Sequence, residues 1–190
     1  MSTTAATPPE LDELSGATIE AVSLIDGLVL DTSRALFGNY GVKLDLDGSS
    51  VAKTLQSVQL ISTIGFSSPT LSGSLLLAIP NAVLQQTLPT DDANLADWSG
   101  ELANQLLGRL KNQLLNYEVA INLALPVVVS GGEFSLPAKT RRLMRHFSFV
   151  SEWGRLFIRT EIELSPSIEL VRQTGVGQTA SMDEGELLFF

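Results

Sequence analysis

The stretch from Asp97 to Tyr117 decides the fold prediction and reads DWSGELANQLLGRLKNQLLNY, without a proline. Placed on a helical wheel at about 100° per residue, its apolar side chains and the preceding leucine fill roughly one half of the circumference. These apolar residues are Leu95, Trp98, Leu102, Ala103, Leu106, Leu107, Leu110 and Leu114. We expect this half to pack on a core, so the stretch is predicted to be a long amphipathic helix around which the rest of the chain is organised.

The opposite half of this helix is polar and carries Asp97, Glu101, Asn104, Gly108, Lys111 and Asn112. A carboxylate and a carboxamide at positions i and i+3 therefore share one exposed face. Gly108 follows one turn later, although a glycine inside a helix costs about 1 kcal/mol relative to alanine. Two interpretations stay open: a docking face with a bare backbone, or an ordinary solvated face with a small residue at a helix crossing.

Composition limits the function classes. A chain of 190 residues favours one domain with a sizeable core. It has no cysteine and a single histidine, His146, so disulfides, thiol nucleophiles and histidine-rich metal sites are excluded. The formal net charge of −9 disfavours nucleic acid as a partner, because affinity for nucleic acid depends largely on neutralising phosphates. An acidic protein that binds another protein fits better.

Domain organisation follows from the two ends of the chain. Residues 1–9 are rich in Ser, Thr, Ala and Pro and are expected to be a flexible leader. Residues 10–172 are expected to form the folded domain, and residues 173–190 an acidic C-terminal tail that ends in an apolar tetrapeptide. No apolar run reaches the roughly 18 residues that a membrane span needs, and no secretion signal is recognisable. We expect a cytoplasmic protein with no membrane partner.

The segment before the central helix is predicted to contain a helix, a β-hairpin and a short helix. The first helix begins at Glu10, fades at Phe37-Gly38-Asn39-Tyr40-Gly41 and has a candidate break at Asp26-Gly27. The hairpin comprises residues 58–67 and 71–79, and the short helix residues 81–88. Thr90, Asp91, Asp92 and Asn94 then supply N-terminal capping signals for the central helix.

The segment after the central helix is predicted to be mainly strand. Residues 119–129 are interrupted by Pro126, which favours an edge strand or one that leaves the ladder there. A hairpin follows at residues 143–150 and 155–164, with a further helical turn at 167–171. The order helix, two strands, two helices and three strands predicts an α+β, two-layer domain, in which long helices pack on one face of an antiparallel sheet. A doubly wound parallel sheet is disfavoured, because strands and helices do not alternate strictly.

The central helix and the element order resemble the CheC, CheX and FliY family of bacterial chemotaxis phosphatases. The family motif places an Asp or Ser one helical turn before a Glu-x-x-Asn pair, with a proline in the strand that follows. Asp97, Glu101, Asn104 and Pro126 occupy those positions here. The resemblance covers roughly residues 15–170. CheC carries two such motifs and this chain carries one, so CheX is the more similar branch.

The resemblance implies a protein aspartyl-phosphate phosphatase that acts on a CheY-like response regulator. It implies that Asn104 positions the attacking water and that Glu101 pairs with the regulator's active-site lysine. The regulator is expected to supply Mg²⁺, so no cofactor of this chain's own is implied. It also implies a homodimer formed through sheet edges.

Three further residues of the helix are predicted to belong to the partner-binding face: Asp97, Gly108 and Lys111. Asp97 is expected to cap or orient the helix start. Gly108 has two interpretations of equal weight, because it would either admit a partner or relieve crowding inside the domain. Trp98 is expected in the core, and the basic cluster from Lys139 to Arg145 is expected to be a solvated hairpin face, with contact to an acidic regulator as the alternative.

Two other functions compete with the phosphatase hypothesis. One is a non-catalytic CheX-like module that binds a receiver domain or a signalling complex. The other is a structural component of a flagellar switch, which is less favoured because the chain has one motif and no recognisable appended switch domain.

Overall fold

The computed structural model describes residues 16–47, 54–56, 60–90, 93–131, 133–135 and 142–166, together with residues 168, 170 and 172. For residues 54–56 and 133–135 it describes the backbone alone. The predicted leader, most of the turn predicted at 167–171, the C-terminal tail, and Lys139 and Arg141 of the basic cluster lie outside these residues.

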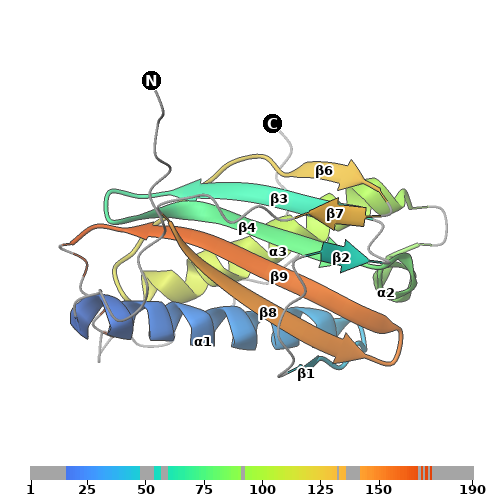
Figure 1. The fold of residues 1–190 in the computed structure, drawn as a ribbon, viewed down its shortest axis with the longest axis horizontal. Helices are drawn as coiled ribbons and strands as arrows, with labels where there is room; N and C mark the ends of the chain where they lie inside the picture. The colour runs from blue at the N-terminus through green and yellow to red at the C-terminus, as the bar shows by residue number, and fades with distance from the viewer. Residues whose placement is uncertain are drawn as a thin grey trace.

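The long elements follow the predicted order (Figure 1). In chain order the elements are α1 (Gly16–Asn39), β1 (Asp45–Leu46), β2 (Thr54–Gln56), β3 (Leu60–Ser67), β4 (Leu71–Ile79), α2 (Asn81–Thr87), α3 (Leu95–Leu115), β5 (Asn122–Leu123), β6 (Val127–Ser130), β7 (Glu133–Ser135), β8 (Leu143–Ser151) and β9 (Gly154–Leu164). The sequence pattern does not indicate β1, β2 and β7, because strands of two or three residues are too short to display a period of two.

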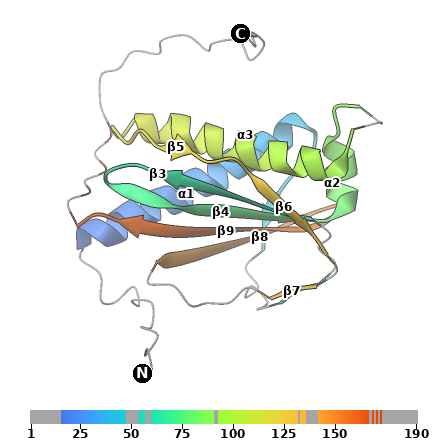
Figure 2. The same ribbon diagram turned by 90° about the horizontal axis from the view of Figure 1, so that it is seen from above.

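The described strands form one large antiparallel sheet and one small one. The large sheet has seven strands in the order β1-β8-β9-β4-β3-β5, and β6 also pairs with β3. Strands β5 and β6 therefore share the edge beside β3, and residues 124–126 separate them. Figure 2 shows α1 and α3 side by side on one face of this sheet. The predicted α+β class with two layers is confirmed.

The core lies between that helical layer and the sheet. Buried positions alternate over residues 71–77 of β4, as expected where one face of a strand is covered. Three consecutive residues are buried at 60–62, 77–79, 147–149 and 158–160, and Ile61 and Ala78 form a small cluster separate from the main core. From the helices, buried residues include Val22, Ile25, Val29, Leu36 and Phe37 of α1 and Leu102, Leu106, Leu107, Leu110 and Leu114 of α3. Six of the eight apolar residues predicted for α3 are buried, whereas Leu95 and Trp98 are half-buried.

Helix α1 is continuous through Asp26-Gly27, so the candidate break there is wrong. Ile25 and Val29 are buried on either side of it. The Asp26 carboxylate also accepts a hydrogen bond from Arg145 Nε of β8 at 2.7 Å, which joins the middle of the helix to the sheet. This packing and ion pairing outweigh the cost of about 1 kcal/mol for a glycine inside a helix.

The predicted helix stop at residues 37–41 is confirmed. Gly41 has φ +75, a backbone conformation that residues other than glycine adopt only at a cost in free energy. The amide of Val42 donates to the carbonyl of Phe37 at 3.0 Å, which closes the turn. This turn holds Tyr40 directly after α1 and beside α3.

Candidate functional site

Asn94 caps the N-terminus of α3. Its side chain accepts hydrogen bonds from the backbone N–H groups of Ala96 at 2.8 Å and Asp97 at 3.2 Å. The first turn of the helix therefore begins where the capping signals predicted it. Asp97 is not the cap; its exposed carboxylate lies in the first turn, where negative charge is favoured by the helix dipole.

The five predicted site residues form one stripe on the solvent side of α3. Asp97, Glu101, Asn104, Gly108 and Lys111 follow one another at intervals of four, three, four and three residues, which keeps them on the same helical face. The side chains of Asp97, Glu101 and Asn104 are exposed, and Gly108 and Lys111 are partly exposed. At 1.5 Å per residue the stripe is about 21 Å long. The structure thus brings all five residues to one continuous surface.

The two glycines of α3 have different surroundings. A Cβ atom added at Gly108 would meet nothing within 4 Å. Crowding inside the domain therefore does not account for this glycine, and the backbone there borders open space. A Cβ at Gly100 would lie 3.2 Å from Val128 Cγ2 and 3.7 Å from Pro126 Cγ. Gly100 is thus the glycine that lets β6 and the motif proline approach the helix.

A buried pair of hydroxyl groups fixes the other side of α3. Ser99 and Ser62 of β3 are both fully buried, and their Oγ atoms lie 2.6 Å apart. The sequence pattern does not indicate Ser99, because a serine beside the apolar half of a wheel has no distinguishing mark. The contact joins α3 to β3 two positions before Glu101.

The Glu101 carboxylate has a partner on its own helix. Gln105 Nε2 donates to Glu101 Oε1 at 3.0 Å, and Gln105 Oε1 accepts from the Tyr40 hydroxyl at 2.8 Å. The Tyr40 and Trp98 rings meet edge to face, with centroids 5.6 Å apart. Trp98 also donates from Nε1 to Thr87 Oγ1 at 2.9 Å. Trp98 therefore packs against the core, as expected, and also contacts a residue bonded to the site.

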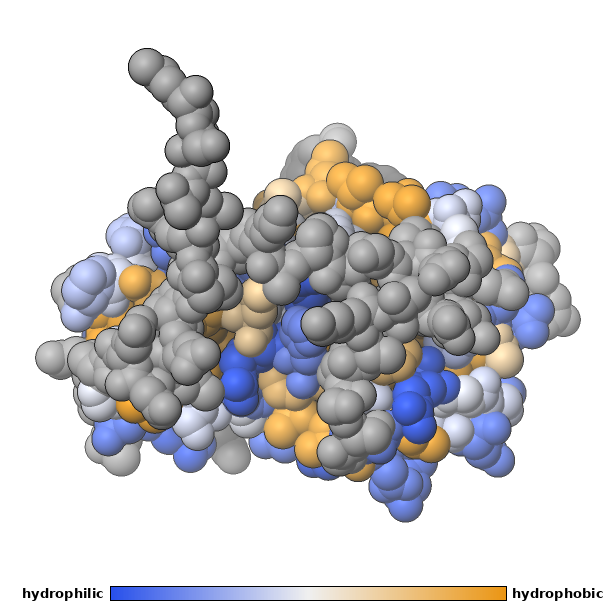
Figure 3. Space-filling view, in the orientation of Figure 1, coloured by the Kyte–Doolittle hydropathy of each residue, from blue (hydrophilic) through white to orange (hydrophobic). Residues whose placement is uncertain are grey.

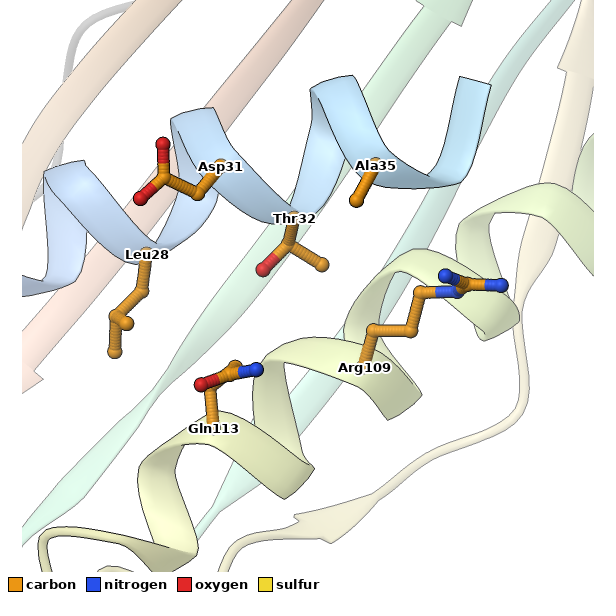
Figure 4. Close-up of a pocket in the computed structure, with 6 residues that line it drawn as sticks. All are labelled: Leu28, Asp31, Thr32, Ala35, Arg109 and Gln113. Carbon is orange, nitrogen blue, oxygen red and sulfur yellow. The ribbon is translucent and has the colours of Figure 1, made fainter. Parts of the chain in front are cut away.

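A hollow of about 270 Å³ lies between α1 and α3, one turn away from this stripe. Figure 4 shows its lining residues: Leu28, Asp31, Thr32, Ala35, Arg109 and Gln113. A second hollow continues toward Tyr117. Neither of these two hollows is lined by Glu101 or Asn104, whose side chains are exposed on the stripe.

The charged groups around the sheet are mostly paired. Within the basic cluster, Arg145 pairs with Asp26 and Arg142 lies 3.5 Å from Glu163. His146 is exposed on β8, and its pKa is lowered by partial desolvation of the ring and then by the nearby positive charge of Arg159. In the described part of the chain, no three His, Asp or Glu side chains lie close enough to hold a metal ion. None of the described helices has the length and apolarity to cross a membrane.

An apolar strip follows the edge of the sheet at β6. Leu125, Val127 and Val129 are 87%, 62% and 51% exposed. Val127 and Val129 alternate along β6 and so point to the same side of the strand, and Leu125 lies two residues before it. Figure 3 shows this hydrophobic area at the upper edge of the molecule, where β6 runs in Figure 1.

Comparisons with known proteins agree with this fold. Residues 60–148 match the family model described as chemotaxis phosphatase CheX. Over these residues the chain is similar to CheX, and solved structures of the CheC, CheX and FliY group share its fold. The matched residues include both the Glu101–Asn104 pair and Pro126. The resemblance inferred from the motif is confirmed.

Solved CheX structures share the architecture. CheX from Vibrio vulnificus is 22% identical with a TM-score of 0.62, and the match covers 73% of this chain and 96% of that one. CheX from Desulfovibrio desulfuricans is 15% identical with a TM-score of 0.63, covering 73% and 99%. A Borrelia burgdorferi complex of CheX with CheY, BeF3 and Mg²⁺ is 12% identical with a TM-score of 0.55, covering 73% and 97%. No curated protein sequence matches the chain.

Proposed function

We propose that this protein hydrolyses the aspartyl phosphate of a CheY-like receiver domain. The observation that carries the proposal is the position of Glu101 and Asn104, which are exposed one turn apart on the convex face of a firmly anchored helix in a CheX fold. A convex pair of side chains cannot enclose a small substrate. It can enter the active site of another protein, and a receiver domain carries its phosphoryl group in such a site.

In the proposed reaction, water attacks the phosphorus atom. The bond from phosphorus to the aspartate oxygen breaks, the aspartate carboxylate is restored, and the phosphoryl group leaves as inorganic phosphate with the proton lost by the water. Asn104 accepts a hydrogen bond from this water with Oδ1, while its Nδ2 can donate to a phosphoryl oxygen. Positioning of this kind is a main source of rate in phosphoryl transfer.

The remaining stripe residues serve docking in this proposal. Glu101 pairs with the receiver's lysine, in a contact that loses its water when the two surfaces meet. Gly108 leaves the backbone bare so that the receiver approaches closely, and Asp97 and Lys111 flank the contact. The receiver holds the Mg²⁺ that its phosphoryl chemistry requires. A receiver substrate of this kind places the protein in the cytoplasm.

The sheet edge supports a second element of the proposal, a homodimer. Strand β6 lies at the edge beside β3 and carries the exposed Val127 and Val129, with the exposed Leu125 just before the strand. Exposed apolar edge strands pair readily with other strands. A second copy of this chain is the proposed partner for that edge.

Phosphate decay tests the catalytic proposal. Purified CheY-like receiver domains of the same organism are phosphorylated with acetyl phosphate, and their dephosphorylation is followed with and without this protein. Asn104→Ala should lose most of the acceleration, because removal of one preorganised hydrogen-bonding group lowers rates roughly 10²- to 10³-fold. Gln113→Ala is a matched control, since Gln113 is also exposed on α3 but lines the hollow beside α1 and not the stripe. Equal decay with the wild type and Asn104→Ala would rule out the proposed mechanism.

The same assay distinguishes the non-catalytic alternative. A binding module would retain a beryllofluoride-charged receiver domain after loss of both Glu101 and Asn104, and neither the wild type nor the variant would release phosphate.

A further inference from the structure

The side chain of Gln105 makes two hydrogen bonds, one to its own helix and one to a distant part of the chain. Its Nε2 donates to Glu101 Oε1 at 3.0 Å, and its Oε1 accepts from the Tyr40 hydroxyl at 2.8 Å. The second bond joins residues that are 65 positions apart in the chain. It ties the site helix to the turn that ends α1, so the arrangement does not depend on α3 alone.

The direction of these hydrogen bonds is fixed by chemistry. An ionised carboxylate only accepts hydrogen bonds, so Gln105 must present its NH₂ group to Glu101. Its carbonyl oxygen then faces Tyr40 and needs a donor, which the phenol supplies. Tyr40 is itself half-buried and packs edge to face on Trp98, whose indole N–H is bonded to the buried Thr87. The chain of contacts runs from the core to the exposed carboxylate.

We propose that Gln105 and Tyr40 are positioning residues that hold the Glu101 carboxylate in its docking orientation. This inference rests on the proposed function and assigns two residues to it that the family motif does not contain. An exposed glutamate samples several side-chain rotamers and loses that freedom when it binds. The bond from Gln105 restricts Glu101 beforehand, occupies Oε1 and leaves Oε2 to meet the receiver's lysine.

The division of roles predicts which kinetic constant changes. Asn104 has no part in this chain of contacts. When the contacts of Gln105 and Tyr40 are removed, Asn104 should therefore still position the attacking water. Gln105→Met and Tyr40→Phe should each raise KM for the phosphorylated receiver roughly two- to tenfold, the range expected for ordering one side chain on binding, with kcat nearly unchanged. Methionine keeps the length of the glutamine side chain, and phenylalanine keeps the ring against Trp98. Gln113→Met is the matched control on the same helix, and its KM should equal that of the wild type.

A double-mutant cycle shows whether Gln105 acts through Glu101. In a Glu101→Ala background, Gln105→Met should cause no further rise in KM, because the carboxylate that it holds is gone. A full additional rise would assign Gln105 a direct contact with the receiver and overturn the proposal. A fall in kcat with unchanged KM would also overturn it. Thermal unfolding of each variant checks that the fold is retained.

The hydrogen bonds that join Tyr40, Gln105 and Glu101, here called the tether, can be detected by NMR in the free protein. The side-chain NH₂ resonances of Gln105 should shift in both Tyr40→Phe and Glu101→Ala, and stay in place in Gln113→Met. Unshifted resonances would show that the tether is absent in solution and would overturn the inference. If the wild type is active, Asn104→Ala is inactive and Gln105→Met has an unchanged KM, the positioning role is rejected and the proposed phosphatase function stands. A wild type without phosphatase activity would reject the proposed function, and the positioning role with it.

Discussion

The Oγ atoms of Ser62 and Ser99 lie 2.6 Å apart in the buried contact between β3 and α3. Ser99→Ala should lower the free energy of unfolding by about 1–3 kcal/mol, because it leaves a fully buried hydroxyl on Ser62 without its partner. The double variant Ser62→Ala/Ser99→Ala should cost less than the two single substitutions added together. Urea denaturation of the four proteins measures this coupling, and strict additivity would contradict it.

The two glycines of α3 should respond in opposite ways to the same substitution. Gly108→Leu should preserve or slightly raise the free energy of unfolding, because the site is open and leucine favours helix by up to about 1 kcal/mol over glycine. It should nevertheless weaken binding of a beryllofluoride-charged receiver domain. Gly100→Leu should destabilise the fold, by about 1–3 kcal/mol or more, because the added side chain enters the contact with Val128 and Pro126. Thermal melts paired with a binding titration test both expectations, and a large stability loss in Gly108→Leu would assign that glycine to internal packing.

His146 should make the protein less stable at mildly acidic pH. Partial desolvation and the charge of Arg159 lower the pKa of this exposed residue below the ordinary value of about 6.5, so the folded protein binds a proton less readily than the unfolded chain does. Above the pKa of His146 in the unfolded chain, about 6.5, the residue is neutral in both states and has no effect on stability. As the pH falls from about 6.5 through the lower pKa of the folded state, preferential protonation of the unfolded chain reduces the free energy of unfolding. The decrease in Tm between about pH 7.5 and pH 5.5 should therefore be smaller for His146→Gln than for the wild type. Thermal melts recorded at intervals of about 0.5 pH unit over this range measure the difference. Parallel slopes for the wild type and His146→Gln would exclude this role.

The sequence predicts the long elements of this fold because they have a readable period. The leucines of α3 recur every three or four residues, and all of those from Leu102 to Leu114 are buried. The same wheel placed Glu101 and Asn104 on the opposite, exposed side. Local periodicity thus suffices to find the helix, its buried half and the stripe of candidate site residues.

What the sequence does not reveal depends on contacts between distant residues. Gly100 and Gly108 are the same residue type in one helix, and only the position of β6 makes one of them crowded. Tyr40 and Gln105 carry no local pattern that joins them across 65 positions. The break in the strand at Pro126 was predictable from the missing N–H, whereas its packing against Gly100 was not.

The β6 edge gives the most direct test of the proposed dimer. Val127 is 62% exposed, and a lysine there would place a charge in an interface formed by this edge. Val127→Lys should convert a dimer into a monomer in sedimentation velocity at micromolar concentration, with little change in Tm for the monomer fold. Val150→Lys is the matched control, because Val150 is exposed on β8, which lies at the opposite side of the sheet. A wild type that already sediments as a monomer, or a dimer that Val127→Lys leaves intact, would show that this edge does not hold two copies together.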